Sequence, residues 1–252
     1  MSTPGSRLLE GRLALVTGGS RGLGRAICLA LAQEGASVAF NYLRADAEAE
    51  KTLAALRELG ARAWAFKISV LDRAGLQEMV RTLEREAGVV VDVLVNNAGI
   101  GQVVPVALME EEDWDRMMDV NVKGAFLTSQ AVMRGMVREQ RGRILNISSL
   151  AGAKMMQAPV HYCAAKAAMK GFTEGLAKEL GRYGITVNCL APGVLNEGVS
   201  HNLPQNRLQE FLRHCALGRV GTVQECAEVV AVLVSDRNSY LTGSTIVLDG
   251  GV

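Results

Sequence analysis

Seven short aliphatic runs recur along the chain, each separated from the next by a longer segment with helical periodicity. Most of the runs are continuously apolar, which is typical of parallel strands buried on both faces. Such alternation of strands and helices predicts an α/β fold, a doubly wound parallel sheet with helices on both faces. The runs are 13–17, 37–41, 62–67, 91–95, 143–148, 185–190 and 244–249.

Several residues indicate where the intervening helices begin and end. The apolar positions of 22–33 recur every three or four residues, and Gly35 is placed to end that helix. Asp72 is expected to cap the helical run that follows it, and Thr222 with Glu225 forms the pattern of a capping box. The apolar fraction is 49% but the aromatic fraction only 4%, so the core is expected to be aliphatic.

The chain of 252 residues suits one domain, since neither a linker nor a change of composition divides it. We expect residues 1–7 to be a mobile tail. A net charge of +1 gives no sign of nucleic acid, and no apolar run is long enough for a membrane span, so a cytoplasmic protein is expected. The five cysteines are scattered without a C-x-x-C or Cys/His cluster, which argues against disulfides and a metal site.

A glycine-rich turn, TGGSRGLG at 17–24, connects the first expected strand to the first expected helix. Its glycines would let the backbone approach a pyrophosphate at the amino end of that helix. A turn that only packs strand on helix is the alternative, but the position in the first βα unit favours a dinucleotide and a Rossmann-like fold. The expected cofactor contacts here are Gly18, Ser20, Arg21, Gly22, Leu23 and Gly24.

The residues after the second strand bear on which dinucleotide binds. An NAD site usually has a carboxylate there for the ribose 2′-hydroxyl. Here the strand ends in Asn41 and Tyr42 and Arg44 follows, all three of them expected cofactor contacts, while Asp46 belongs to the next helix. With Arg21 in the glycine turn, two arginines without an early acid favour a 2′-phosphate and thus NADP(H). Both arginines could instead be simply solvated.

Polar motifs also follow the fourth and fifth strands. VNNAG spans 95–99, NISSLAG spans 146–152, and Tyr162 precedes Lys166 by one helical turn. Ligands bind at the carboxyl ends of strands in open parallel sheets, so these groups are expected to line one crevice with the glycine turn.

Taken together and in this order, the motifs resemble the short-chain dehydrogenase/reductase family over essentially the whole chain, including NCLAPG at 188–193 and LTGSTIVLDGG at 241–251. The resemblance implies a nicotinamide-dependent oxidoreductase. Tyr162 would be the general acid/base, with its pKa lowered by Lys166, which would also hold the nicotinamide ribose. Ser149 rather than Ser148 would orient the carbonyl, and Asn121 would hold a water in the proton relay.

The resemblance adds further cofactor contacts at the strand ends, namely Asn97, Ala98, Gly99, Pro192 and Gly193. It also implies a homotetramer built through helices at 112–139 and 159–181 and the last strand. His161 is interpreted as a rim residue or a modest substrate contact and Cys163 as a packing residue. The two methionines 155–156 are interpreted as pocket or loop residues.

Within the family the chain is similar to the 3-oxoacyl-[acyl-carrier-protein] reductases. That similarity implies reduction of a β-ketoacyl thioester in fatty-acid or polyketide synthesis, with an acidic carrier protein docking on basic residues near the active-site mouth, among them Arg141 and Arg182. Cations that complement helix dipoles are the plainer interpretation of these arginines, which also include Arg134, Arg138 and Arg143. A ketoreductase for free ketones and a non-catalytic NADP-binding subunit are the rival functions.

Three departures from the family pattern leave the substrate open. Asn196 and Glu197 stand where a threonine usually contacts the carboxamide, and Ser69 stands where an aspartate usually faces the adenine. The expected substrate lid, 194–217, carries no recognisable substrate signature.

Overall fold

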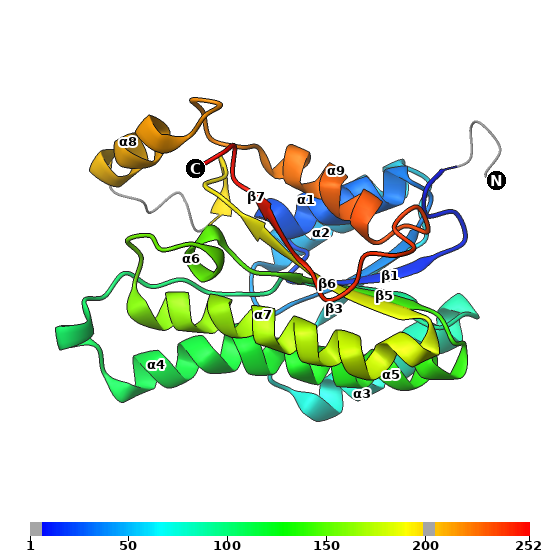
Figure 1. The fold of residues 1–252 in the computed structure, drawn as a ribbon. Coiled ribbons are helices and arrows are strands. Elements are labelled where there is room, and N and C mark those ends of the chain that lie inside the picture. Colours follow the sequence, from blue (N-terminus) through cyan, green and yellow to red (C-terminus); the bar gives the residue numbers. More distant parts are fainter. Residues whose placement is uncertain (1–6, 199–204) are drawn as a thin grey trace.

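A seven-stranded parallel sheet forms the middle layer of the computed structural model, which describes residues 7–198 and 205–252. Its strand order is β3-β2-β1-β4-β5-β6-β7 (Figure 1), so the direction of winding reverses between β1 and β4. The predicted doubly wound fold is confirmed. The strands are β1 (Leu13–Thr17), β2 (Ser37–Tyr42), β3 (Ala63–Lys67), β4 (Val93–Asn96), β5 (Gly142–Ile147), β6 (Ile185–Pro192) and β7 (Thr245–Leu248).

Helices cover both faces of this sheet, as Figure 1 shows. Helices α1 (Gly22–Gln33), α2 (Asp46–Glu58) and α9 (Val223–Leu233) lie on one face, and α3 (Arg73–Ala87), α5 (Gly124–Arg138) and α7 (Val160–Leu180) on the other. The remaining elements are η1 (Val106–Leu108), α4 (Glu111–Met118), η2 (Asp119–Lys123), α6 (Leu150–Ala153), η3 (Gly181–Tyr183) and α8 (Gln205–His214).

Strand β1 explains why its sequence is apolar without a break. Ala14 and Val16 pack into the cluster with α1 and α9, while Leu13 and Leu15 pack into the cluster with α3, α5 and α7. All four side chains are fully buried. Because successive residues of a strand point to opposite faces, a sheet covered on both sides requires apolar residues at every position.

The predicted helix boundaries are confirmed at three positions. Asp72 caps α3 by accepting a hydrogen bond from the Gly75 amide, and Thr222 and Glu225 form the capping box of α9. Gly35 follows α1 with a φ of +93°, a conformation that favours glycine.

The backbone is helical over nearly all of the predicted 112–139, but the helix is not a regular α-helix throughout. A π-helical turn, η2, separates α4 from α5. At this turn the Asn121 amide donates to the backbone oxygens of Ile100 and Met117, at 3.1 and 3.0 Å. The polar contact to the β4 loop offsets the irregular backbone, and π turns of this kind are frequent at functional sites.

The central strand β4 provides a test of this core. Leu94 is fully buried in β4, so Leu94→Ala is expected to lower the free energy of unfolding by about 2–5 kcal/mol through lost burial and a cavity. The measurement is urea denaturation followed by circular dichroism. Leu43→Ala is the matched control, since Leu43 is 55% exposed and its truncation should cost less than about 1 kcal/mol. Equal losses in the two variants would contradict the assigned core.

Candidate active site

The glycine turn after β1 is wound tightly enough to exclude larger residues. Gly18 and Gly22 have φ values of +70° and +54°. A Cβ on Gly24 would overlap the Gly18 carbonyl oxygen and lie 2.7 Å from the side-chain nitrogen of Asn97. The turn therefore needs glycine, and it brings the backbone close to the amino end of α1.

That helix end has no cap from any side chain in the described part of the chain, and its first turn carries no acid. Helices α3 and α9, in contrast, are capped by Asp72 and Thr222. An uncapped amino end leaves backbone N–H groups and the positive end of the helix dipole for an anion. The turn therefore fits the pyrophosphate of a dinucleotide.

Two asparagine side chains, those of Asn41 and Asn97, stabilise the glycine turn through hydrogen bonds. The Asn41 side-chain oxygen accepts from the Gly18 amide at 3.3 Å, and its nitrogen donates to the Ile68 carbonyl at 2.8 Å. The Asn97 side chain donates to the Thr17 carbonyl at 2.9 Å. Asn41 is 2% exposed, and its side chain supports the turn between β1 and α1. Its contact with the cofactor stays a prediction.

The charged side chains expected to determine the preference between NADP(H) and NAD(H) lie beyond the end of β2. Arg44 and Arg21 are exposed and have no ion pair with any described residue. Asp46 begins α2, as predicted, and pairs with Lys67 of β3 at 2.7 Å. Burial and a hydrogen bond to Asp46 raise the pKa of Tyr42. The part of Lys67 could not be read from the sequence, because only strand pairing places it beside Asp46.

Lys166 lies at the contact between α7 and β5. The residue is 6% exposed, and its ammonium donates to the Ile147 carbonyl at 3.0 Å, at the carboxyl end of β5. The Ser148 hydroxyl donates to the Lys166 carbonyl at 2.7 Å. Ser148 is thus used to join α7 to the strand, which leaves Ser149 to face the site.

Ser149 and Tyr162 meet across this edge. Ser149 caps the short helix α6, and its hydroxyl hydrogen-bonds the Tyr162 side chain. The Lys166 ammonium lies 5.8 Å from the centre of the Tyr162 ring. The structure therefore brings the proposed acid, its orienting hydroxyl and its cation together.

The predicted lowering of the Tyr162 pKa by Lys166 is wrong for the chain alone. Burial raises the pKa of Tyr162, and only the hydrogen bond from Ser149 opposes this. Burial also lowers the pKa of Lys166 from 10.5 to about 8. With a pKa of about 8 the Lys166 ammonium still carries its charge at pH 7, so it is burial of the phenol that sets the direction of the Tyr162 shift.

Asn121 and Gly99 complete the inner wall of the site. A Cβ on Gly99 would lie 2.6 Å from the Asn121 side-chain oxygen and 3.4 Å from the Lys166 ammonium nitrogen. That Asn121 oxygen is buried and accepts no hydrogen bond from any described residue. It is a free acceptor close to the lysine, which fits a water held between them.

The remaining residues singled out in the sequence are two strand-end contacts, Ala98, Ser69 and the expected lid. Pro192 ends β6 and Gly193 follows it, at the same carboxyl edge, and the Ala98 amide is held by the Thr17 hydroxyl at 2.9 Å. Ser69 accepts from the Leu71 amide within its own turn. Of the expected lid, residues 199–204 lie outside the described residues.

Two residues near the site differ from expectation. His161 is fully buried, not at the rim, and neither ring nitrogen has a hydrogen-bond partner among the described residues. Burial lowers its pKa, although Asp113 of α4 opposes this. Met155 is fully exposed, whereas Met156 packs under α8.

The arginines expected at the active-site mouth lie at the opposite edge of the sheet within this chain. Arg141 precedes β5 and pairs with Asp92 and Asp236, at 3.8 and 2.8 Å. Arg182 lies in η3, ahead of β6, and stacks on Tyr183. Since both precede strands while the site residues follow strands, a docking place at the mouth of the same subunit is wrong.

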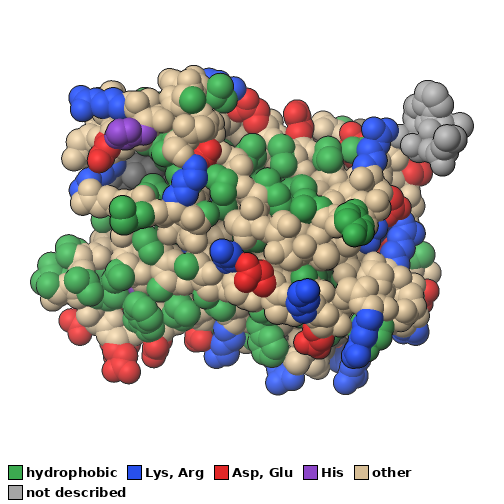
Figure 2. All heavy atoms as spheres, in the orientation of Figure 1, with side chains coloured by type: hydrophobic (Ala, Val, Ile, Leu, Met, Phe, Trp, Pro, Cys, Tyr) green, Lys and Arg blue, Asp and Glu red, His purple; other side chains and the backbone are tan. Residues whose placement is uncertain are grey.

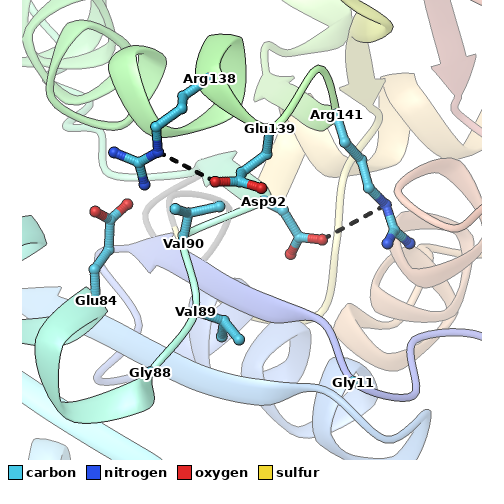
Figure 3. A pocket seen from close by; sticks show the side chains of 9 residues that line it. All are labelled: Gly11, Glu84, Gly88, Val89, Val90, Asp92, Arg138, Glu139 and Arg141. Carbon is cyan, nitrogen blue, oxygen red and sulfur yellow. Dashed lines mark hydrogen bonds and ion pairs between the residues drawn. The ribbon is translucent and has the colours of Figure 1, made fainter.

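Figure 3 shows the pocket of about 550 Å³ at that amino edge, in which Arg141 reaches Asp92 and Arg138 reaches Glu139. Its arginines are thus paired with acids, and no residue predicted for cofactor or catalysis lines it. The lining residues are Gly11, Glu84, Gly88, Val89, Val90, Asp92, Arg138, Glu139 and Arg141.

The fold and this group of side chains define an oxidoreductase. The chain belongs to the short chain dehydrogenase family, whose model matches residues 12–208. It is 38% identical to the 3-oxoacyl-[acyl-carrier-protein] reductase FabG of Staphylococcus epidermidis over 239 residues, which is 95% of this chain and 98% of the relative. The family uses a nicotinamide cofactor.

Two solved structures have the same fold. A 3-oxoacyl-[acyl-carrier protein] reductase from Brucella melitensis matches with a TM-score of 0.89 and 36% identity, covering 100% of this chain and 96% of that one. A short-chain dehydrogenase/reductase from Serratia marcescens matches with a TM-score of 0.89 and 35% identity, covering 97% and 98%.

The buried lysine generates a pH-dependent prediction. In the unfolded chain Lys166 titrates near 10.5 but in the fold near 8, so the unfolded state binds more protons between these values and stability rises with pH across this window. Lys166→Met should therefore stabilise the cofactor-free protein at pH 7 by about 1–3 kcal/mol, and the gain should shrink toward pH 10. The measurement is urea denaturation at both pH values.

Lys178→Met is the control for this comparison, because Lys178 is exposed on the same helix and should change stability by less than about 0.5 kcal/mol. A Lys166→Met variant that is less stable than the parent at pH 7 would contradict the cost of burying this ammonium.

Proposed function

We propose that the chain catalyses the NADPH-dependent reduction of a 3-oxoacyl thioester, carried by an acyl carrier protein, to the 3-hydroxyacyl thioester. The observation that carries this proposal is the convergence of Ser149, Tyr162, Lys166 and Asn121 on one side of the glycine turn. Similarity to reductases named for this substrate supports the choice of carbonyl. The pathway would be fatty-acid or polyketide synthesis.

Each side chain has a proposed part in the reaction. The Ser149 hydroxyl donates a hydrogen bond to the substrate carbonyl oxygen and stabilises the charge that develops there. The Tyr162 hydroxyl transfers its proton to that oxygen, which gives the 3-hydroxyl group. Asn121 holds a water through its free oxygen, and this water returns a proton toward Tyr162 by way of Lys166. When bound, the nicotinamide supplies the hydride that adds to the carbonyl carbon.

Burial of Tyr162 keeps it in the protonated form that the proposed reduction uses. A raised pKa keeps the phenol protonated at neutral pH, as a proton donor requires.

NADPH is proposed over NADH because of the charges beyond β2. Arg21 and Arg44 have no ion pair with any described residue and are exposed for contact with a 2′-phosphate, and Lys67 pairs with the nearby acid Asp46. An arginine binds a phosphate through paired, charge-assisted hydrogen bonds.

Apolar side chains flank the same edge of the sheet. Val103, Val106 and Leu108 follow β4 and are 70–74% exposed. Figure 2 shows hydrophobic side chains gathered over this side of the molecule, beside α4. They would suit an acyl chain. The exposed Glu197 and the distant, paired Arg141 favour a second candidate, an NADP-dependent ketoreductase for a free ketone.

Assembly and location stay predictions. We propose a homotetramer formed through α4, α5, α7 and the β7 region, in which Arg182 of one subunit would reach the mouth of another and bind a carrier protein. Within residues 7–198 and 205–252 the structure has no helix long and apolar enough to cross a membrane. A cytoplasmic location is proposed.

The first test is NADPH oxidation with acetoacetyl thioester by the parent protein and by Tyr162→Phe. Without the phenolic proton, turnover should fall at least about a hundredfold while NADPH binding is kept. Tyr183→Phe is the control, since Tyr183 lies beyond α7 at the opposite edge. If a free ketone is reduced and the thioester is not, the second candidate replaces the first.

The dinucleotide preference is tested with Arg44→Ala. Loss of a charged hydrogen bond to the 2′-phosphate should raise the KM for NADPH about tenfold and leave the KM for NADH within about twofold. Steady-state kinetics with both dinucleotides check this. Arg57→Ala, exposed at the end of α2, is the control. A parent enzyme that prefers NADH would refute the proposal.

A further inference from the structure

The end of β7 and the segment after it, residues 248–252, contact three parts of the chain that lie far apart in the sequence. Lys154, beyond α6, donates to the Asp249 carboxylate at 2.7 Å and also to the Val252 carbonyl. The Leu217 amide donates to the Gly250 carbonyl at 3.1 Å. At the end of β7, the Leu248 carbonyl accepts from the Gly193 amide at 2.9 Å.

These contacts join the loop of the proposed catalytic serine to the proposed cofactor edge. Ser149 caps α6, and the Lys154 amide closes that helix on the Leu150 carbonyl at 2.8 Å. Lys154 is therefore attached to Ser149 through a single rigid turn. On the other side, Asp249 directly follows β7, whose last residue, Leu248, accepts the hydrogen bond from the Gly193 amide.

An apolar cluster beneath the ion pair joins the same segments. Leu150 and Val194 are buried with Phe211 and Cys215 of the α8 region, and Val252 packs against them. The Lys154 ammonium thus closes over a packed junction of the serine loop, the end of β6, α8 and residues 249–252.

The environment of the carboxylate makes the pair more than a surface contact. The Asp249 side chain is 8% exposed, whereas that of Lys154 is 42% exposed. Burial raises the pKa of Asp249, but the hydrogen bond from Lys154 and the nearby backbone amides bring it below its usual value. A buried carboxylate without its ammonium is strongly destabilised, so the loop that carries Lys154 is held at this position.

We propose that Lys154 is a positioning residue for the reaction, which holds the Ser149 hydroxyl in register with the nicotinamide end of the cofactor edge through its ion pair with Asp249. Lys154 touches neither substrate nor cofactor in this role. The inference rests on the proposed function of Ser149. Catalysis is sensitive to the placement of such a hydroxyl, and a shift of about 1 Å costs up to a hundredfold in rate.

The test compares Lys154→Met with Lys154→Arg. The methionine variant should lose roughly 10-fold to 100-fold in kcat and bind NADPH with a Kd within about twofold of the parent, since the glycine turn is untouched. The arginine variant should recover most of the rate, because it restores the cation. Lys51→Met is the matched control, since the Lys51 ammonium pairs with Glu48 at the same 2.7 Å but on α2, and it should leave kcat unchanged.

A double-mutant cycle with Asp249→Asn separates positioning from general weakening. If the pair acts as one unit, the double variant should be no slower than the slower single variant, whereas independent effects would multiply. Multiplying effects would overturn the proposal. So would a Lys154→Met rate within about twofold of the parent, or a folded Lys154→Arg variant as slow as Lys154→Met.

Amide hydrogen exchange provides a readout that needs no substrate. Lys154→Met should speed exchange in 150–156 while α3 stays as in the parent. Unchanged exchange in 150–156 would also overturn the proposal. Failure of the thioester assay in the parent would refute the proposed substrate alone, since the kcat comparison can then be made on a free ketone and the exchange comparison on the protein itself.

Discussion

The contact between the Lys166 side chain and the end of β5 is the constraint on which the rest of the site depends. The ammonium bonds the Ile147 carbonyl, and the Ser148 hydroxyl bonds the Lys166 carbonyl, so helix and strand are joined twice within two residues. This fixes the rotation of α7 about its axis. Tyr162, one turn earlier on α7, must then face Ser149, and the ammonium must face the narrow space over Gly99.

Burial shifts the pKa values of both titratable side chains of this site, Tyr162 and Lys166. The same desolvation raises the pKa of Tyr162 and lowers that of Lys166, so each group is driven toward its neutral form. A neutral phenol beside a weakly held ammonium proton suits the release of a proton to a substrate oxygen. The buried side-chain oxygen of Asn121, which has no hydrogen-bond partner among residues 7–198 and 205–252, continues this row of polar groups toward the interior.

Much of the fold could be predicted from local pattern. The strands lie within two residues of the apolar runs, because a sheet covered on both faces requires apolar residues at every strand position. The glycine turn at 17–24 could also be predicted from its sequence. The π turn at Asn121 was not, since 112–139 has an ordinary helical pattern and only the contact with Ile100 explains the break. The burial of His161 and the pairing of Arg141 with Asp236 likewise join residues distant in sequence.

The sequence by itself determined the doubly wound sheet, the dinucleotide turn and the family, because these rest on short-range periodicity and on motifs in a set order. Only the tertiary structure decided that Asn41 supports the turn, that Lys67 neutralises Asp46, and that Lys154 closes on Asp249. The physical reason is shared by all three. Each is a polar contact between the ends of different strands or loops, and a hydrogen bond or ion pair of about 3 Å depends on the register of the whole sheet rather than on its neighbours in the chain.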